Sequence, residues 1–545
     1  MSAGPDRVCA VVACTRHKMM QVELEQAAKK AGLVEVRLDF LAKAVDFKRL
    51  QPFKKCAWVA TIRRPADGGR WPGSEAERQT VLRQAVVSGC FEWIDLETDI
   101  ADAIRRFGPV KRIVSYHNMI ETPPDLDAIY DKMLKQDADV YKIAVMPRTG
   151  ADLAKIVGIQ KRATKPTLCF GMGDFGFPTR FTALKFGAPW IYALFNKDRE
   201  LAPGMPAVAD FRTTYPVKAI GPDSQFFALL GDPVGHSLSP VLHNHLFRRN
   251  KVDAVYVPVR VPNGHLKETV EALKAVPFSG YSVTIPHKEA AAALAAEADP
   301  TVSQVGAANT LVSRANGFFA ANTDFGAAID SIRAHLDAKA EETNTAAREF
   351  GQLTALVLGA GGAARAIAFA LHRAGTQVTI AARTTERAQK LAEEVGCKHV
   401  DWVARHNVSP CDVVVNCTPV GMHPNVDESP LHVSFLRPDL IVFDTVYNPE
   451  QTLLLRDAKS RGCGIVSGLE MFVRQAARQF ELFTGLAPSL EQLRELTRKA
   501  LSPLTKAMDE EAVKSGMAES EEVPPSDPKW QVKYSGEGTK QGDGQ

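Results

Sequence analysis

The sequence predicts an α/β protein: an N-terminal (β/α)8 barrel followed by a two-lobed α/β unit whose second lobe is Rossmann-like. Three observations support this. The chain has 545 residues, room for about three or four domains. Eight short apolar runs recur in its first 195 residues. A strand, a glycine turn and a helix then follow one another from Thr354.

The eight apolar runs are rich in β-branched and aromatic residues, and longer helical or loop stretches separate them. They cover residues 8–13, 34–38, 57–62, 93–96, 112–116, 140–145, 167–170 and 190–195. Such a repeat could also build an open, doubly wound sheet. The even spacing, and the polar residues just after the runs, favour a closed barrel whose loops form a site at one end.

The rest of the chain divides by composition. Residues 1–215 are predicted to form the barrel and 216–225 a linker, because the stretch from Arg212 to Ser224 combines Pro, Gly and polar residues without periodicity. A second α/β pattern begins at Phe226. Residues 338–350 are charged and lack an apolar face, which indicates a surface insertion between two lobes. Residues 506–545 are acidic, then Gly- and Pro-rich, which is typical of a disordered tail.

Composition narrows the function. Lys and Arg number 66 against 63 Asp and Glu, so the net charge of +3 favours small-molecule substrates over nucleic acid. The nine cysteines are scattered without a C-x-x-C pair, so we expect no metal site and a reducing, cytoplasmic location. No apolar run approaches the ~20 residues of a membrane span, and we expect neither secretion nor insertion.

The glycine turn predicts a dinucleotide site. Small residues between a strand and a helix let the backbone approach a pyrophosphate at the helix N-terminus. These residues are Gly359, Ala360, Gly361, Gly362, Ala363 and Ala364. A tight turn without a ligand is the alternative interpretation.

The strand after this turn predicts which dinucleotide binds. It spans residues 377–382 and ends without the acidic residue that would bind a free ribose 2′-hydroxyl. Arg383, Thr384 and Arg387 stand there instead, and two cations suit a 2′-phosphate. The predicted cofactor is therefore NADP.

Lys288 is a candidate general acid or base. It follows a buried-looking strand and a proline in GYSVTIPHK, 280–288, where its ammonium could be held at a cleft. Asp324 in NTD, 322–324, would complete a proton-handling pair. Upstream, Ser237 and Ser239 could grip a carboxylate, although serine before proline is also a good helix start.

The barrel carries its own constellation at successive strand ends. Lys142 lies in a strand so apolar that an unpaired ammonium there should have a lowered pKa, and a desolvated amine can form a Schiff base. His117 could move the protons that imine chemistry requires. Taken singly, these are a structural histidine and a strand-edge lysine. The other members are Glu35, Arg37, Asp39, Arg63, Glu97 and Arg180.

The second half resembles shikimate dehydrogenase. The motifs, in order, are GDPVGHSLSP (231–240), VTIPHK (283–288), GAANT (306–310), NTD (322–324), GAGGAAR (359–365), NCTPVGM (416–422) and SGLEMFVRQA (467–476). The resemblance implies a substrate lobe, 226–336 with 467–501, and a Rossmann-like NADP-binding lobe, 350–466. It implies Lys288 and Asp324 as the catalytic pair. It also implies a substrate site of Ser237, Ser239, Thr284, Asn309, Tyr447 and Gln475, and cofactor contacts from Asn416, Thr418 and Met422.

The first half resembles type I 3-dehydroquinate dehydratase over about residues 8–212. The motifs are EVRLD (35–39), TIR (61–63), DLE (95–97), SYH (115–117), YKIAVMP (141–147), TR (179–180) and APG (202–204). Two positions depart from the family pattern. Asp67 stands where the family usually has a glutamate that orients the histidine. Met205 stands where it usually has a glutamine, whose amide hydrogen bonds a thioether cannot replace.

The two halves in this order resemble the fused dehydratase–dehydrogenase enzymes of aromatic biosynthesis. The resemblance implies that Lys142 forms an iminium with 3-dehydroquinate while His117, oriented by Asp67, moves protons. Arg180, Arg63, Glu35 and Arg37 would bind substrate, and Lys288 with Asp324 would serve the NADPH reduction of 3-dehydroshikimate. A quinate-preferring dehydrogenase remains an alternative, as does a ligand-sensing regulator that keeps both folds without chemistry.

Overall fold

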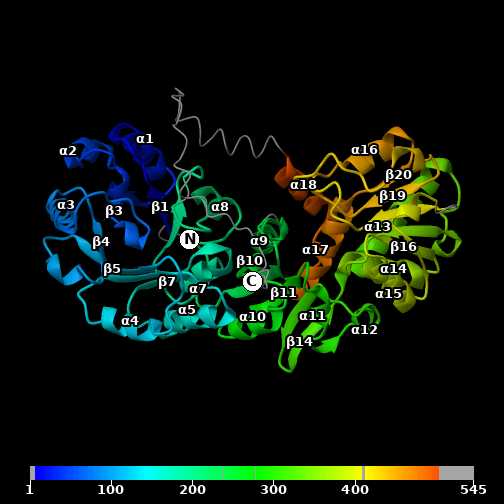
Figure 1. The fold of residues 1–545 in the computed structure, drawn as a ribbon, viewed down its shortest axis with the longest axis horizontal. Coiled ribbons are helices and arrows are strands. Elements are labelled where there is room, and N and C mark those ends of the chain that lie inside the picture. The colour runs from blue at the N-terminus through cyan, green and yellow to red at the C-terminus, as the bar shows by residue number, and fades with distance from the viewer. Residues whose placement is uncertain (1–6, 200, 236, 277, 408–410, 503–545) are drawn as a thin grey trace, which may run out of the picture.

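The computed structural model describes residues 7–502, except 200, 236, 277 and 408–410; the expected tail lies outside the described residues. Figure 1 shows three bodies in a row. The barrel lies at one end, a lobe that we call the middle lobe lies next to it, and a Rossmann lobe lies at the far end. The α/β fold with an N-terminal barrel and a Rossmann-like sheet is confirmed.

The barrel contains the eight predicted strands, each inside or overlapping its apolar run. They are β1 (Val8–Val12), β2 (Leu33–Arg37), β3 (Ala57–Thr61), β4 (Trp93–Glu97), β5 (Lys111–Asn118), β6 (Val140–Val145), β7 (Thr167–Gly171) and β8 (Ile191–Leu194). All the pairs are parallel, in the order β7-β6-β5-β4-β3-β2-β1-β8. Among the described residues no ladder joins β7 to β8, so the barrel is nearly closed.

Helices cover the barrel from outside. They are α1 (His17–Ala28), α2 (Phe47–Leu50), α3 (Glu75–Val87), α4 (Leu126–Met133), α5 (Gly150–Arg162), α6 (Gly173–Gly176), α7 (Thr179–Lys185) and α8 (Val208–Thr213). Local sequence sets their starts. Ser74 with Glu77, and Thr149 with Asp152, form capping boxes that satisfy the free N–H groups at the first turns of α3 and α5.

The middle lobe is a six-stranded mixed sheet in the order β10-β9-β11-β13-β14-β12. The strands are β9 (Gln225–Gly231), β10 (Ala254–Arg260), β11 (Phe278–Val283), β12 (Ala295–Ala298), β13 (Thr310–Arg314) and β14 (Gly317–Ala321). The helices are α9 (Ser239–Arg249), α10 (Leu266–Leu273), α11 (Lys288–Ala292) and α12 (Pro300–Val305). Two C-terminal helices, α17 (Gly468–Thr484) and α18 (Leu490–Leu501), return to pack in one apolar core with β9 and α9.

The Rossmann lobe is an all-parallel sheet in the order β17-β16-β15-β18-β19-β20. The strands are β15 (Thr354–Leu358), β16 (Gln377–Ala382), β17 (Lys398–Asp401), β18 (Val413–Asn416), β19 (Ile441–Asp444) and β20 (Gly464–Val466). The helices are α14 (Gly362–Arg373), α15 (Thr385–Val395) and α16 (Leu453–Ser460). Strand order reverses between β15 and β18, and ligands of such sheets bind at the carboxyl ends there.

One long helix, α13 (Thr323–Thr343), passes from the middle lobe to the Rossmann lobe and packs against both α14 and α17. The predicted surface insertion at 338–350 therefore needs a correction. Its first six residues continue α13, with most side chains exposed, and Asn344 in a left-handed conformation ends the helix. A charged stretch without an apolar face can still be helical when it extends a helix that is anchored elsewhere.

The connector between the barrel and the middle lobe is packed. Tyr215, Val217 and Ile220 are buried in an apolar core that runs on from the barrel into β9 and β10. The Nζ of Lys185, at the end of α7, donates hydrogen bonds to the carbonyls of Pro222 (2.5 Å) and Ser224 (2.8 Å). The expected interdomain connector is thus part of a packed interface between the barrel and the middle lobe.

A second contact strengthens this interface. The helices α5 and α10 lie side by side, and the N–H of Gly150 donates to Glu268 Oε1 at 3.2 Å. A Cβ on Gly150 would lie 3.0 Å from the carbonyl oxygen of Glu268 and 3.1 Å from the Cβ of Ala272. Glycine at this position lets the two helices approach closely.

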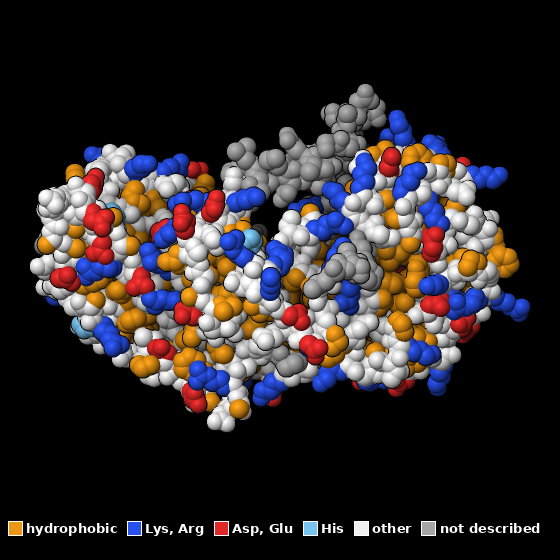
Figure 2. Space-filling model, turned by 180° about the vertical axis from the view of Figure 1, so that it is seen from behind, with side chains coloured by type: hydrophobic (Ala, Val, Ile, Leu, Met, Phe, Trp, Pro, Cys, Tyr) orange, Lys and Arg blue, Asp and Glu red, His pale blue; other side chains and the backbone are white. Residues whose placement is uncertain are grey.

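The surface has no single sign of charge on the face that Figure 2 shows, where Lys and Arg side chains lie interspersed with Asp and Glu. Among the helices of the described part of the chain, none has the length and apolarity to cross a membrane.

Candidate active sites

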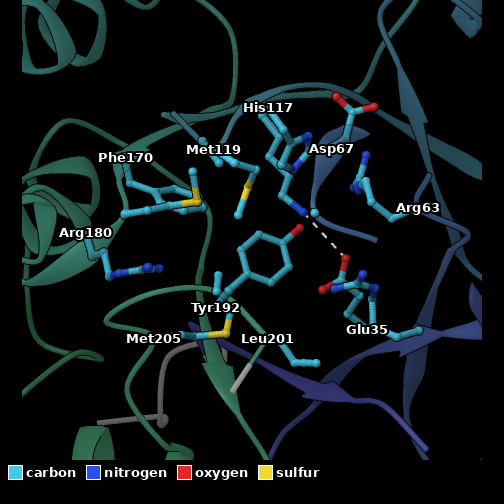
Figure 3. Close-up of a pocket in the computed structure, with 16 residues that line it drawn as sticks. Glu35, Arg63, Asp67, His117, Met119, Phe170, Arg180, Tyr192, Leu201 and Met205 are labelled. Carbon is cyan, nitrogen blue, oxygen red and sulfur yellow. Dashed lines mark hydrogen bonds and ion pairs between the residues drawn. The ribbon is translucent and has the colours of Figure 1, made fainter. Parts of the chain in front are cut away.

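A pocket of about 520 Å³, counted out to its open mouth, lies at the carboxyl ends of the barrel strands (Figure 3). This is the end of a β/α barrel at which sites are built. Asp39 and Glu97, which were also predicted for the barrel site, do not line this pocket, but it gathers the other seven predicted residues, together with Met205. The seven are Glu35, Arg37, Arg63, Asp67, His117, Lys142 and Arg180. Side chains from distant parts of the sequence therefore form one site.

Lys142 lies in the pocket but its ammonium is paired. Its Nζ is 3.0 Å from Asp95 Oδ2, 3.5 Å from Glu35 Oε1 and 4.1 Å from the ring centre of Tyr192. The prediction of an unpaired ammonium in an apolar strand is therefore wrong. The residues around Lys142 in β6 are apolar, but the register of the sheet directs carboxylates from β2 and β4 toward its side chain.

Arg63 links Lys142 to a wider buried network. Its guanidinium pairs with Asp95 (2.8 Å) and Glu97 (2.9 Å), and Glu97 also pairs with the buried Arg78 (2.8 Å). Burial disfavours the charged form of Arg63, but Asp95 and Glu97 outweigh burial and raise its pKa. Arg63 therefore stays ionised, and its ion pairs hold Asp95 and Glu97 in position.

Glu35 and Arg37 point into the pocket from the end of β2. Glu35 accepts a hydrogen bond from Thr61 Oγ1 at 2.8 Å. Arg37 makes a two-pronged pair with Asp39, at 2.9 and 2.8 Å, and the Asp39 carboxylate also accepts the N–H of Arg70. Asp39 is buried and does not line the pocket, so it holds Arg37 in place.

His117 is partly exposed to the pocket, but its Nδ1 is buried and has no hydrogen-bond partner among the described residues. Loss of solvent around the ring, with the charges of Arg63 and Lys142, lowers the pKa of His117 well below its usual value. The ring is therefore a neutral base at neutral pH. Asp67 lines the same pocket, but its carboxylate accepts a hydrogen bond from Arg64.

Arg180 lies across the pocket from Glu35 and Arg63 (Figure 3). It is 1% exposed, and none of its three guanidinium nitrogens has a partner among the described residues. Its guanidinium stacks on Phe170, 4.6 Å from the ring centre. Burial lowers the pKa of Arg180 to about 10. A buried, unpaired cation that faces a cavity is a site for an anion.

The wall beside Arg180 is apolar, and most of it was not predicted. Phe170, Met172, Leu201, Met205 and Tyr192 line it. Met205 was expected as a departure from the family pattern. Tyr192 could have been found, because in the apolar run 190–195 it alternates with residues that face the barrel exterior.

A second site lies between the middle lobe and the Rossmann lobe. Lys288 begins α11, Asp324 lies in the first turn of α13, and Lys288 Nζ donates to Asp324 Oδ2 at 2.6 Å. The same lysine side chain reaches the glycine turn, because a Cβ on Gly362 would lie 3.0 Å from Lys288 Cδ. The predicted proton-handling pair therefore lies beside the predicted cofactor turn.

Four of the predicted substrate residues come together from three segments. Ser237, in the turn before α9, donates from its Oγ to the Oγ of Ser239, the first residue of that helix, at 3.2 Å. Tyr447, from the loop after β19, contacts Ser237, and burial raises the pKa of its hydroxyl. Tyr447 stacks on Phe472 at 4.4 Å. Gln475, one turn further along α17, donates to the carbonyl of Phe472.

Thr284 and Asn309 take different positions. Thr284 is partly exposed at the end of β11. Asn309 is buried, and its side chain donates to Thr323 Oγ1 and accepts the N–H of Thr323, both at 2.9 Å. Asn309 therefore anchors the start of α13, the helix turn that carries Asp324.

The glycine turn is built for close approach. Gly359 has φ +116°, and a Cβ there would lie 3.1 Å from the carbonyl oxygen of Cys417. Gly361 precedes α14 without a side-chain cap, and a Cβ on it would meet nothing within 4 Å. Ala360, Gly362 and Ala363 are partly exposed and Ala364 is buried. The N-terminus of α14 thus presents free N–H groups to open space, which fits a dinucleotide pyrophosphate.

Asn416 is fully buried, and its hydrogen bonds support the loop that carries Thr418 and Met422. Its side chain donates to Asp444 Oδ1 (3.0 Å), and its Oδ1 accepts the Oγ1–H (2.6 Å) and the N–H (3.0 Å) of Thr418. Asp444, which sequence reasoning missed, also accepts Thr452 Oγ1 at 2.7 Å. Asn416 therefore shapes the loop of Thr418 and Met422; Met422 itself is 46% exposed.

Arg383, Thr384 and Arg387 lie together at the carboxyl end of β16. Thr384 is the residue before α15, and Arg387 lies in its first turn. All three are exposed, and neither guanidinium forms an ion pair with another described residue. Both arginines are thus available to a phosphate.

Models of four protein families match this chain in succession. They are type I 3-dehydroquinase over residues 8–222, the shikimate dehydrogenase substrate binding domain over 229–311, shikimate/quinate 5-dehydrogenase over 341–429, and the shikimate 5′-dehydrogenase C-terminal domain over 468–498. The order agrees with the barrel, the middle lobe, the Rossmann lobe and the returning helices.

A relative spans both halves. The bifunctional 3-dehydroquinate dehydratase/shikimate dehydrogenase, chloroplastic, of Arabidopsis thaliana is 37% identical over 504 residues, which are 89% of this chain and 83% of the relative. The chain belongs to this bifunctional family. Its barrel is the dehydratase half, and its two C-terminal lobes are the dehydrogenase half.

Relatives of the dehydrogenase half alone are also known. The structure of shikimate 5-dehydrogenase from Thermus thermophilus, in complex with NADP(H) and shikimate, is 34% identical and covers 51% of this chain and all of that one, with a TM-score of 0.45. The shikimate dehydrogenase (NADP(+)) of Bacillus mycoides is 38% identical over 283 residues, 51% of this chain and 99% of that protein. By sequence, the dehydrogenase half is thus similar to a complete enzyme.

Proposed function

We propose that this enzyme dehydrates 3-dehydroquinate in the barrel through a Schiff base on Lys142 and reduces the product, 3-dehydroshikimate, with NADPH in the dehydrogenase half. Family membership supplies the two activities and the cofactor. One observation carries the assignment of residues. A buried lysine and a buried, unpaired arginine face one pocket that a keto acid could fill.

In the barrel, Arg180 binds the substrate carboxylate, since that guanidinium lacks any other anion among the described residues. The C3 carbonyl then lies toward Lys142. Condensation joins Lys142 Nζ to C3 and releases the carbonyl oxygen as water, and the iminium acidifies the adjacent carbon. His117, neutral because of its lowered pKa, removes that proton and helps the C1 hydroxyl to leave as water. A water molecule then adds to C3 and breaks the C–N bond, which releases 3-dehydroshikimate and regenerates the amine of Lys142.

The other polar residues of the pocket bind and orient. Glu35, Arg37 and Arg63 offer an acceptor and donors to the substrate hydroxyls opposite Arg180. Asp67, from the same wall, supports the imidazolium that forms when His117 takes the proton. The hydrogen bond of its carboxylate is made with Arg64, so Asp67 acts on His117 electrostatically and without direct contact.

In the dehydrogenase half, Lys288 donates a proton to the oxygen of the reduced carbonyl, and Asp324 holds the ammonium in position. The cofactor supplies the hydride when bound. Gly359 through Ala364 would hold its pyrophosphate, Arg383, Thr384 and Arg387 its 2′-phosphate, and Thr418 and Met422 its nicotinamide end. Asn416 keeps that last loop in shape.

The substrate of the second reaction lies against the middle lobe. Ser237, Ser239 and Tyr447 surround its carboxylate, and Thr284 and Gln475 its hydroxyls. Asn309 contributes through the start of α13. Because Tyr447 comes from the Rossmann lobe and Ser237 from the middle lobe, the site is complete only when the two lobes are together.

Small molecules are the proposed partners, and the near-balanced charge does not favour nucleic acid. A reducing compartment such as the cytoplasm suits the nine cysteines, all of which are free and lie within the described residues. The Arabidopsis relative is chloroplastic.

The test adds 3-dehydroquinate and NADPH to the purified enzyme and follows the conjugated enone absorbance and NADPH oxidation together. Both signals should appear, with the first preceding the second. In a parallel sample, borohydride should trap the substrate on Lys142, and peptide mass spectrometry locates the adduct. An adduct on another lysine, or trapping by Lys142→Ala, overturns the mechanism.

A further inference from the structure

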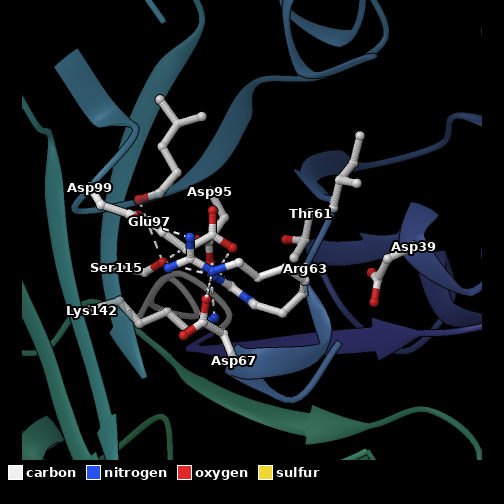
Figure 4. Close-up of polar contacts among 12 residues, drawn as sticks. Asp39, Thr61, Arg63, Asp67, Asp95, Glu97, Asp99, Ser115 and Lys142 are labelled. Atoms are coloured by element: carbon white, nitrogen blue, oxygen red, sulfur yellow. Dashed lines mark hydrogen bonds and ion pairs between the residues drawn. The ribbon is translucent and has the colours of Figure 1, made fainter. Parts of the chain in front are cut away.

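Asp95 is a buried carboxylate that the proposed mechanism has not used. It lies inside β4, with 2% of its surface exposed. Figure 4 shows it at the centre of the network. Its Oδ2 is 2.8 Å from Arg63 and 3.0 Å from Lys142 Nζ, and its Oδ1 accepts Ser115 Oγ at 2.5 Å.

The charges around the Lys142 ammonium come from every side of the barrel. Asp95 and Glu35 are the carboxylates in contact, and the Tyr192 ring lies above the ammonium. His117 and Cys9 also interact electrostatically with Lys142, and Arg63 and Arg37 line the same pocket. Two of these neighbours are cations, so the Lys142 site needs a fixed anion.

Resting on the proposed function, we infer that Asp95 is the counterion that accompanies Lys142 from ammonium to iminium. The step conserves charge. Lysine ammonium and ketone give iminium and water: the C–N bond forms, the C=O bond breaks, and the carbonyl oxygen leaves with two of the three ammonium protons. One positive charge stands on the same nitrogen before and after, so one carboxylate serves both states.

Asp95 suits this role better than Glu35 because it is closer and held more firmly. Glu35 lies 0.5 Å further from Nζ (3.5 against 3.0 Å), and the same oxygen also accepts Thr61. Three donors hold Asp95. Burial alone would raise the pKa of Asp95, but Arg63 and Lys142 outweigh burial and hold it well below its usual value. The carboxylate therefore stays ionised throughout the working range of pH.

The contact has two opposing effects on the reaction. It stabilises the ammonium through the 3.0 Å ion pair, which opposes formation of the nucleophilic amine. It also stabilises the iminium, so the adduct is held once it forms. Removal of the charge should therefore shift adduct formation to lower pH and reduce the amount of adduct at equilibrium.

The experiment measures adduct formation against pH. The full-length enzyme is mixed with 3-dehydroquinate at each pH, quenched with borohydride, and analysed by mass spectrometry for the fraction of Lys142 modified. In Asp95→Asn the acid limb should move to lower pH by about 1 to 3 units, the usual effect of losing an adjacent opposite charge. The largest modified fraction should fall by about tenfold or more.

Two variants keep the test decisive. Glu97→Gln removes a buried carboxylate of the same network that contacts Arg63 and Arg78 but not Lys142, and its shift should be less than half that of Asp95→Asn. Asp95→Glu retains the charge and should keep the acid limb within about 0.5 unit of wild type. If Asp95→Asn does not fold, a large shift in Asp95→Glu still overturns the inference.

The outcomes separate the two hypotheses. Wild-type enzyme that gives no adduct on Lys142 overturns the proposed function itself. Wild-type adduct with an unshifted limb in folded Asp95→Asn overturns only the role of Asp95, as does an equal shift in Glu97→Gln. Thermal denaturation of each variant establishes that the barrel is folded.

Discussion

The carboxylate of Asp67 accepts a hydrogen bond from the guanidinium of Arg64, three residues earlier in the chain. Arg64 pairs in turn with Asp99 at 2.6 Å, outside the pocket. Meanwhile Nδ1 of His117, in the same pocket as Asp67, has no partner among the described residues. An aspartate is one methylene shorter than a glutamate, and in this structure the Asp67 carboxylate bonds to Arg64 and not to His117 Nδ1.

Asp67→Asn should slow dehydration by roughly 10- to 100-fold, because the imidazolium of His117 loses a nearby negative charge. The rate of enone formation against pH is the measurement, and its limb for His117 should move to lower pH. Asp99→Asn is the matched control, since it removes the other carboxylate on Arg64. Wild-type rate and pH profile in Asp67→Asn would instead make Asp67 a turn residue before Gly68, whose φ is +77°.

The two activities should be separable by single substitutions. Lys142→Ala should abolish dehydration and leave reduction of added 3-dehydroshikimate nearly intact, while Lys288→Ala should do the opposite. The two lysines lie in different domains, Lys142 in β6 of the barrel and Lys288 in α11 of the middle lobe. Steady-state assays of each half-reaction, with melting curves as the check on folding, decide the point. Loss of both activities in a folded variant contradicts independent sites.

Arg180→Met should weaken substrate binding and stabilise the barrel. Loss of a two-pronged partner for a carboxylate should raise KM for 3-dehydroquinate on the order of 100-fold. In wild type the folded state carries the cost of burying the Arg180 charge without a partner. Methionine removes that cost, so Tm should rise. Arg180→Lys separates charge from geometry, and it should recover only part of the binding. A lower Tm in Arg180→Met contradicts the unpaired state of Arg180.

Arg383→Ala should reduce the preference for NADP over NAD by about tenfold or more, the cost of one charge-assisted bond to the 2′-phosphate, ~1.5 to 3 kcal/mol. The ratio of kcat/KM for the two cofactors measures it. Lys390→Ala, an exposed cation further along α15, is the control and should leave the ratio unchanged. An unaltered ratio in Arg383→Ala removes Arg383 from the phosphate site.

Asp444 should make the stability of the Rossmann lobe pH-dependent. Burial raises the pKa of Asp444 from 3.8 to about 6, although hydrogen bonds from Thr452, Val446 and Asn416 oppose the shift. The folded state then holds the proton more tightly than the unfolded state between these values, so stability falls as pH rises toward and through 6. Between pH 5 and 7.5 the loss is about 1 to 1.5 kcal/mol.

Urea denaturation of wild type and Asp444→Asn at several pH values isolates this contribution. The difference between the two proteins should change over pH 4–6 and be flat above pH 7. Asp427→Asn, an exposed carboxyl of the same lobe, is the control. A constant difference across that range contradicts a raised pKa.

The strands and the gathering of the barrel site followed from the sequence because each depends on local pattern. A run such as 140–145 is apolar at nearly every position, as a strand in a parallel barrel must be, and polar residues after such runs reach the same rim. The glycine turn could likewise be predicted, because its small residues lie between a strand and a helix.

The partners of the site residues did not follow, because they depend on register between strands. Lys142 stands beside Ser115 on β5, and Ser115 stands beside Glu97 on β4, so Asp95 reaches the lysine from two strands away. The apolar residues next to Lys142 in the sequence do not predict that Asp95 contacts it. Asn416 and Asn309 were similarly predicted as ligand contacts from motif position, and both are buried in hydrogen bonds to their own chain.

The packed interface between the two halves couples their responses to substitution. Lys185 of α7 donates to the carbonyls of Pro222 and Ser224, and Gly150 of α5 lies against α10. A bulky side chain at this interface, as in Gly150→Leu, should disturb the packing of both halves, so a single substitution should lower both activities. The two halves are therefore joined by packing as well as by the peptide bond.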